Sequence, residues 1–216
     1  MRFVSILFAA LLLAGFVSSV QAQEAKKAAK IDPKELEKAK KAFVEKLGSQ
    51  TEKFEVKEIK EGFIFNNRTD RVTLLVLWTK QCKSCIKQIP NLNRYFLDLR
   101  GKLEIIAVEL SGMHTQELQA FAKEHKVLYT LISGVENKQF VAKAMHKFRF
   151  GKDEKGKDKK EGLPFMVVMG YTGHTHAIIR GVPKDPAEME RFLLKIVAHY
   201  EKQRASADAN KTDKTP

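Results

Sequence analysis

The sequence predicts an α/β fold in which helices flank a mixed central β-sheet. A continuous apolar run, residues 72–77, and a second segment, residues 103–110, are typical of strands buried on both faces. Segments with helical spacing of apolar residues follow them, as parallel crossover connections require. Two further runs, residues 165–169 and 176–180, enclose the turn sequence Gly-Tyr-Thr-Gly and predict an antiparallel hairpin that closes the sheet.

The elements expected before the first buried strand are one helix and two short strands. A helix over residues 33–47 has Asp32 as its cap, Pro33 in its first turn and Glu35 at the third position. Short strands are expected over residues 54–59 and 62–66. The α/β domain is therefore preceded by an extra N-terminal helix.

Four helices are expected in the rest of the chain. The first begins at the cysteines and runs to about Arg100, and the next two cover residues 115–125 and 136–148. The last begins after Asp185, where the Asp-Pro-x-Glu helix start recurs. An insertion over residues 149–162 has no apolar side chain from Gly151 onward, so it is expected to be a surface loop.

Composition divides the chain into four parts. Residues 1–22 combine Arg2 with a short apolar run and small residues before Ala22, which predicts a cleaved secretory signal peptide and no stable membrane anchor afterwards. Residues 23–49 form the N-terminal extension and residues 50–203 the α/β domain. Residues 204–216 are a polar tail that is expected to be disordered.

The chain is strongly basic, with a formal charge of +13 at pH 7. An exported chain rarely meets nucleic acid, and most of the lysines alternate with acids, so we expect no nucleic-acid partner. The positive charge is concentrated in residues 80–100, where Asp98 is the single acid. The basic residues there are Lys80, Lys83, Lys87, Arg94 and Arg100.

The two cysteines of the chain, Cys82 and Cys85, are separated by two residues at the junction of a strand and a helix. This spacing allows a disulfide to open and close with little backbone movement. Cys82 lies at the helix start, where free N–H groups and the helix dipole favour a thiolate, so it is the expected attacking sulfur and Cys85 the resolving one. Lys83 and Ser84 are expected to stabilise that thiolate further.

Three other interpretations compete with redox chemistry. A structural disulfide across so small a loop would stabilise the fold little. A zinc site would need two more ligands, for which His174 and His176 are the one paired spacing. A copper site that uses both cysteines and a histidine stays open, although we expect no metal and no cofactor.

The stretch from Trp78 to Pro90, Trp-Thr-Lys-Gln-Cys-Lys-Ser-Cys-Ile-Lys-Gln-Ile-Pro, resembles the periplasmic thioredoxin-like proteins of the TlpA, ResA and CcmG type. The resemblance extends over residues 50–200 and includes Leu163 and Pro164, where that family has a cis-proline facing the dithiol. It implies a thioredoxin-like fold, a redox-active Cys82–Cys85 disulfide, and protein thiols or disulfides as substrates. It also implies a periplasmic location and a membrane electron donor of the DsbD or CcdA kind.

The sequence departs from this family at the positions that handle protons. Val76 replaces the buried acid six residues before the first cysteine, and Gln88 replaces the glutamate three residues after the second. Glu109, at the end of the second buried strand, is a candidate substitute, with a surface role as the alternative. The intervening dipeptide Lys83-Ser84 lacks proline, so Ser84 keeps its N–H and adds a hydroxyl.

Three functions are consistent with these residues. The first is a thiol-disulfide oxidoreductase, acting as a reductase, for example in cytochrome c maturation. The second is a disulfide oxidant or isomerase, and the third is a non-enzymatic module that binds copper or a protein partner.

The C-terminal tail contains one further motif. Asn210-Lys-Thr with Asp208 before it matches a bacterial glycan acceptor pattern, for which chance occurrence is the alternative that we favour.

Overall fold

The computed structural model describes residues 55–151 and 162–212, with side chains as far as residue 206. These residues belong to one compact unit, Val44–Pro216. The predicted signal peptide (1–22), the extension 23–49 with its helix, and residues 152–161 of the charged insertion lie outside the described residues.

A five-stranded mixed sheet forms the centre of the domain, with strand order β5-β4-β3-β6-β7. The parallel part consists of β3 (Val72–Trp78), β4 (Leu103–Glu109) and β5 (Thr130–Ser133). β6 (Phe165–Met169) runs antiparallel to β3, and β7 (Thr175–Arg180) runs antiparallel to β6. The predicted mixed sheet and closing hairpin are confirmed.

The register between β3 and β6 fixes where the functional loops meet. Leu77 pairs with Phe165 and Thr73 pairs with Met169. The end of β3 and the start of β6 therefore lie at the same edge of the sheet. The segment after β3, which carries the cysteines, and the segment before β6, which carries Pro164, are brought together by backbone pairing alone.

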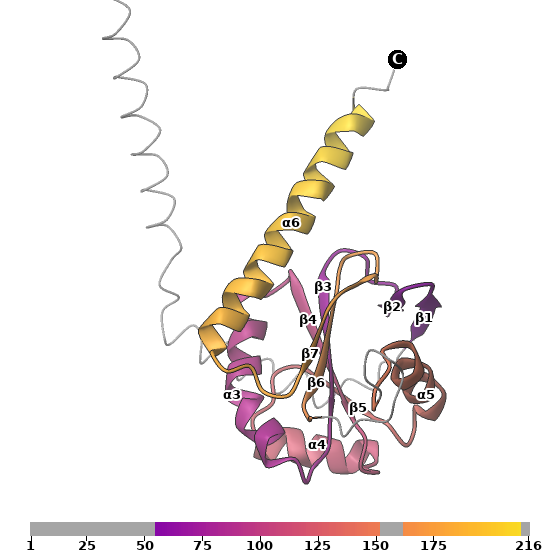
Figure 1. The fold of residues 1–216 in the computed structure, drawn as a ribbon, viewed down its shortest axis with the longest axis vertical. Coiled ribbons are helices and arrows are strands. Elements are labelled where there is room, and N and C mark those ends of the chain that lie inside the picture. Colours follow the sequence, from indigo (N-terminus) through magenta and orange to yellow (C-terminus); the bar gives the residue numbers. More distant parts are fainter. Residues whose placement is uncertain (1–54, 152–161, 213–216) are drawn as a thin grey trace, which may run out of the picture. The chain divides into compact units, whose positions relative to one another are not determined.

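Helices cover both faces of the sheet (Figure 1). One face packs against α3 (Lys83–Asp98), α4 (Thr115–Glu124) and α6 (Pro186–Thr212). The other packs against α5 (Lys138–Lys147) and a separate hairpin of β1 (Val56–Ile59) and β2 (Gly62–Phe65). Alternate residues of β3 point to the two cores, as the period of a strand requires, so both faces of the central strand are apolar.

Two sequence predictions were wrong. β5 was missed, although it pairs in parallel with β4 from Ile106 to Glu109. The tail predicted to be disordered from Arg204 is helical as far as Thr212, because residues 204–212 include three alanines and neither glycine nor proline interrupts them. Asn210 therefore lies in a helix and not in a disordered tail.

The other elements predicted within residues 55–151 and 162–212 agree with the observed ones to within about two residues, as the uncertainty of helix and strand ends allows. None of the helices in the described ranges is both long enough and apolar enough to cross a lipid bilayer.

Glu104 is a buried carboxylate on β4 with an incomplete set of partners. The residue is 7% exposed, and Oε1 accepts a hydrogen bond from Arg68 Nη1 at 3.4 Å. Oε2 is buried and has no hydrogen-bond partner within the described residues. Burial raises the pKa of Glu104, and the nearby Arg68 and Arg71 offset only part of that effect.

We expect Glu104→Gln to flatten the pH dependence of stability. A carboxyl whose pKa is raised on folding binds more protons in the folded state, so stability is lost as pH rises from the unfolded pKa, about 4.3, through the raised folded value. Urea unfolding between pH 4 and 8 should show a smaller loss in the variant, with a difference in slope of at most about 1.4 kcal/mol per pH unit. Equal slopes for both proteins would contradict the raised pKa.

Candidate active site

Cys82 and Cys85 form a disulfide at the start of α3, with their Cα atoms 5.2 Å apart. Cys82 is the N-cap residue, and its own N–H donates to the carbonyl of Thr79 at 3.0 Å, in the turn that follows β3. The strand, the turn and the helix start therefore fix the position of the first sulfur. The helix continues through Pro90. Because proline has no backbone N–H, α3 lacks one helical hydrogen-bond donor at this position.

The two sulfurs have different environments. Cys85 is 6% exposed and packs in the core that includes Ile89 and Leu92, whereas Cys82 is half-buried. Cys82 Sγ accepts a hydrogen bond from the N–H of Cys85 at 3.1 Å. The first turn of α3 contains no acidic residue, so nothing in that turn opposes a negative charge at its N-terminus. This asymmetry favours Cys82 as the attacking sulfur.

The segment before β6 lies beside the disulfide and contains a cis peptide bond between Leu163 and Pro164. The predicted cis-proline is therefore confirmed. Ser84 Oγ lies 3.2 Å from Cys82 Sγ and donates to the carbonyl oxygen of Leu163 at 3.1 Å. The carbonyl of Pro164 accepts from the N–H of Gly181 at 2.8 Å, which holds the segment to the residue after β7. Ser84 thus connects the helix start to the proline segment.

Trp78 is the last residue of β3 and is 5% exposed. Its ring packs against Phe121 of α4, with the ring centroids 4.9 Å apart. Its Nε1 is buried and has no hydrogen-bond partner within the part of the chain that the structure describes. Trp78 therefore supports the site mainly by packing.

A small cavity of about 10 Å³ lies beside Cys85. The two positions at which the resembled family has proton-handling carboxylates, here Val76 and Gln88, line this cavity together with Cys85 and Pro164. None of its lining residues is a carboxylate. The substitutions noted in the sequence are therefore next to the resolving sulfur, which has no acid beside it in this cavity to receive its proton.

Glu109 is buried, with no exposed surface, so the alternative of a surface role is wrong. Its Oε1 accepts from the N–H groups of Lys80 (3.2 Å) and Ser111 (2.8 Å) and from the hydroxyl of Ser111. Its Oε2 accepts from the N–H groups of Gly112 (3.0 Å) and Met113 (2.9 Å).

These contacts decide the chemistry of Glu109. Burial by itself would raise its pKa, but the hydrogen bonds from Ser111, Met113 and Lys80 outweigh burial and lower it. A carboxylate that is held ionised by five donors is a poor proton carrier. None of its hydrogen bonds goes to a cysteine within the described residues, so its role is to fix the loop before Cys82 against the loop after β4.

Sequence reasoning missed the serines that complete this loop. Ser111 hydrogen-bonds to Glu109, and the buried Ser133 donates from its hydroxyl to the carbonyl of Met113 at 2.7 Å. Ser-Gly two residues after a strand-ending Glu, as in Glu109-Leu-Ser-Gly, is the one signal that could have indicated a carboxylate bound by backbone N–H groups.

The basic residues predicted near the cysteines lie at the surface. Lys80, Lys83 and Lys87 are exposed, and Arg94 forms an ion pair with Glu190 at 2.9 Å. Any effect of these charges on Cys82 is therefore exerted partly through solvent, where screening is strong.

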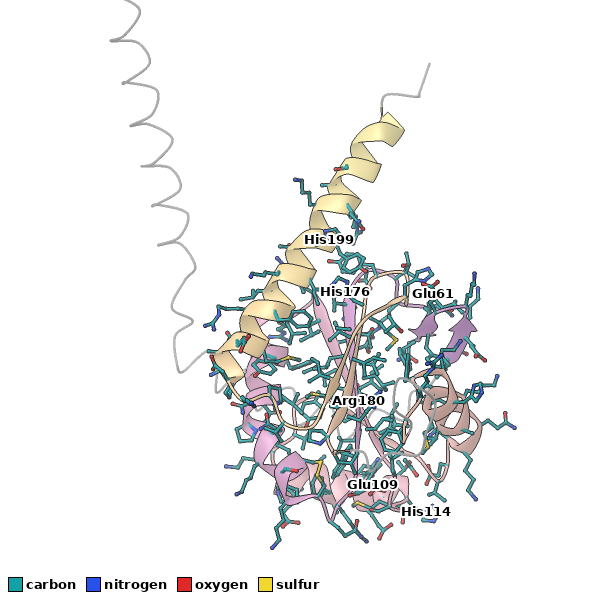
Figure 2. All side chains as sticks on the ribbon, in the orientation of Figure 1. Glu61, Glu109, His114, His176, Arg180 and His199 are labelled. Carbon is teal, nitrogen blue, oxygen red and sulfur yellow. A yellow bond between two sulfur atoms is a disulfide. The ribbon has the colours of Figure 1, made fainter. Side chains whose placement is uncertain are left out.

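The zinc alternative is not supported by the positions of its histidines. His174 and His176 lie at the turn and start of β7, at the end of the sheet that pairs with the beginning of β3. Figure 2 shows His176 and Glu109 toward opposite ends of the sheet. Within residues 55–151 and 162–206, no group of three or more His, Cys, Asp or Glu side chains is arranged to hold a metal ion.

No protein-family model matches the sequence, and no curated protein matches it either. Among solved structures, the chain is similar to a protein from Chlorobium tepidum that is proposed to be a thiol:disulfide interchange protein DsbE, with 16% identity and a TM-score of 0.50 over 67% of this chain and 94% of that one.

Two further similarities are weaker. A thiol:disulfide interchange protein from Bacteroides sp. has 14% identity and a TM-score of 0.49, over 67% of this chain and 86% of that one. StoA from Bacillus subtilis has 16% identity and a TM-score of 0.45, over 63% and 92%. The first similarity, together with the strand order and the cis-proline, shows that the domain has the predicted thioredoxin-like fold.

Proposed function

We propose that the protein is a thiol-disulfide oxidoreductase that exchanges disulfides with protein substrates through Cys82 and Cys85. The observation that carries the proposal is the disulfide at the N-terminus of α3, next to the cis-proline segment, in a thioredoxin-like fold. The similar protein from Chlorobium tepidum, whose assignment is to thiol-disulfide interchange, supports it. We further propose that it works in the periplasm as a reductase, for example in cytochrome c maturation.

The reaction proceeds in two exchanges. The Cys82 thiolate attacks one sulfur of a substrate disulfide, forms a mixed disulfide and releases the other substrate sulfur as a thiolate. Cys85, as its thiolate, then attacks Cys82 Sγ, closes the Cys82–Cys85 disulfide and releases the second substrate thiolate. Two electrons pass from the protein to the substrate. The protons of the dithiol pass to solvent and the substrate thiolates take up protons there.

A reductase must be reduced again after each turnover. In an oxidising compartment this requires a dithiol donor that is itself supplied across the membrane, of the DsbD or CcdA kind. Because an exported chain rarely meets nucleic acid, the partners we propose are proteins alone.

The test uses residues 23–216 with the dithiol reduced and the reductant removed. We expect this protein to reduce the disulfides of insulin, and its reduction potential against glutathione to lie above that of thioredoxin, about −270 mV. The variant with both cysteines changed to serine is the matched control and should be inactive. Absence of insulin reduction by the wild-type protein would favour a non-enzymatic binding module.

A disulfide oxidant or isomerase is the second candidate function. The hydroxyl of Ser84, 3.2 Å from Cys82 Sγ, favours it, because a donor at that sulfur stabilises the thiolate and with it the reduced form. A measured potential close to that of DsbA, about −120 mV, would assign this function in place of the reductase.

A further inference from the structure

Ser84 has one hydroxyl proton and two neighbouring acceptors. Cys82 Sγ lies 3.2 Å from its oxygen, and the carbonyl oxygen of Leu163 lies 3.1 Å away on a segment 79 residues further along the chain. In the disulfide the sulfur carries no hydrogen, so Ser84 is the donor in whichever contact forms. The two acceptors therefore compete for a single proton.

The oxidation state of the dithiol decides this competition. A disulfide sulfur is neutral and a weak acceptor, whereas a backbone carbonyl is a strong one, so the hydroxyl donates to Leu163 in the oxidised protein. A Cys82 thiolate carries a full charge, and hydrogen bonds to charged acceptors are about twice as strong as neutral ones. Rotation of the hydroxyl redirects the bond without movement of the backbone.

We propose that Ser84 is a redox-dependent positioning residue, whose hydroxyl donates to the Leu163 carbonyl in the oxidised protein and to the Cys82 thiolate in the reduced protein. This deepens the proposed function and rests on it. In the oxidised protein the bond ties the cis-proline segment to α3. In the reduced protein that tie is released and the carbonyl of Leu163 regains a free lone pair, which is an acceptor for the N–H of an extended peptide.

This arrangement makes substrate docking and the redox state interdependent. The acceptor at Leu163 is free when the protein is ready to attack, and it is taken up again by Ser84 once the Cys82–Cys85 disulfide has closed. Because linkage is reciprocal, a peptide bound at Leu163 stabilises the Cys82 thiolate. Ser84 and Leu163 are both half-buried. Water therefore cannot freely take the place of the Ser84 donor or the Leu163 acceptor, so the competition between the two acceptors is stronger.

The first test follows alkylation of Cys82 by iodoacetamide as a function of pH in reduced protein. Wild type, Ser84→Ala and Ser84→Thr are compared, the threonine variant retaining the hydroxyl. We expect the midpoint pH to rise by about one unit in Ser84→Ala, since a hydrogen bond to a charged group is lost, and to return toward the wild-type value in Ser84→Thr. An unchanged midpoint in Ser84→Ala would overturn the inference.

The second test measures hydrogen exchange by mass spectrometry in peptides that cover residues 162–168, in oxidised and reduced protein. Wild type should exchange faster in these peptides when it is reduced, and Ser84→Ala should exchange fast in both states. A merely structural serine would give the same change on reduction in both proteins, which would also overturn the inference. Neither test needs a substrate. If the protein does not reduce insulin, the proposed function is refuted, but these two tests still decide the role of Ser84.

Discussion

Replacement of Cys82 by serine should reduce disulfide exchange to the rate observed without protein, whereas Cys85→Ser should still attack and should accumulate mixed disulfides. Cys82 is half-buried at the N-cap of α3 and accepts from the N–H of Cys85, so it is both reachable and favoured as a thiolate. Cys85 is 6% exposed and can act only on a sulfur that is already beside it. Without Cys85, the protein has no second thiol that can break the mixed disulfide between Cys82 and the substrate.

The measurement is the recovery of covalent complexes from cells that express each variant, on gels run without reductant. The two variants are matched, because each lacks the native disulfide and each leaves one thiol. Complexes that disappear on reduction and are found only with Cys85→Ser confirm the roles. Complexes found only with Cys82→Ser would reverse them.

Glu109→Ala should be the most destabilising single substitution among those considered, by about 3–5 kcal/mol, because it leaves several buried donors without an acceptor. The urea midpoint of the oxidised protein should fall while the slope of the transition stays the same. Glu124→Ala on α4 is the matched control: Glu124 is 76% exposed, and its loss should change stability by less than about 0.5 kcal/mol.

The ionisation of Glu109 gives this prediction a pH dependence. A carboxyl whose pKa is lowered on folding stabilises the fold above its unfolded pKa, and that contribution is lost as pH falls through the lowered folded value. Glu109→Ala should therefore lose less stability than the wild type on acidification below about pH 4.3. A variant as stable as Glu124→Ala would show that the five hydrogen bonds contribute little.

The sequence predicted the parts of the fold that are specified locally. The apolar runs of β3 and β4, the closing hairpin and the helix start at the cysteines all have the composition of the structures they form. The cis bond at Pro164 was predicted from a resemblance, because no local property of Leu163 and Pro164 indicates it.

The misses at β5 and Glu109 share a physical cause, which is that their structure depends on partners elsewhere in the chain. β5 has only four residues and is a strand because it pairs with the edge of β4. Its own sequence gives no sign of this pairing. Glu109 was read as a proton carrier or a surface residue because a glutamate at the end of a strand has no sign of burial. Its donors come from two loops that only the folded sheet brings together.

The apolar cavity beside Cys85 has a consequence for how long a substrate stays attached. Cys85 must lose its proton before it can resolve a mixed disulfide, its buried surroundings disfavour the charged form, and Val76 and Gln88 supply no carboxylate. Resolution then waits for transfer to solvent, so we expect the covalent complex to have a long lifetime that increases as pH falls. A protein substrate that stays covalently attached for that time can refold while it is still bound. The cavity beside Cys85 therefore sets the residence time of the substrate.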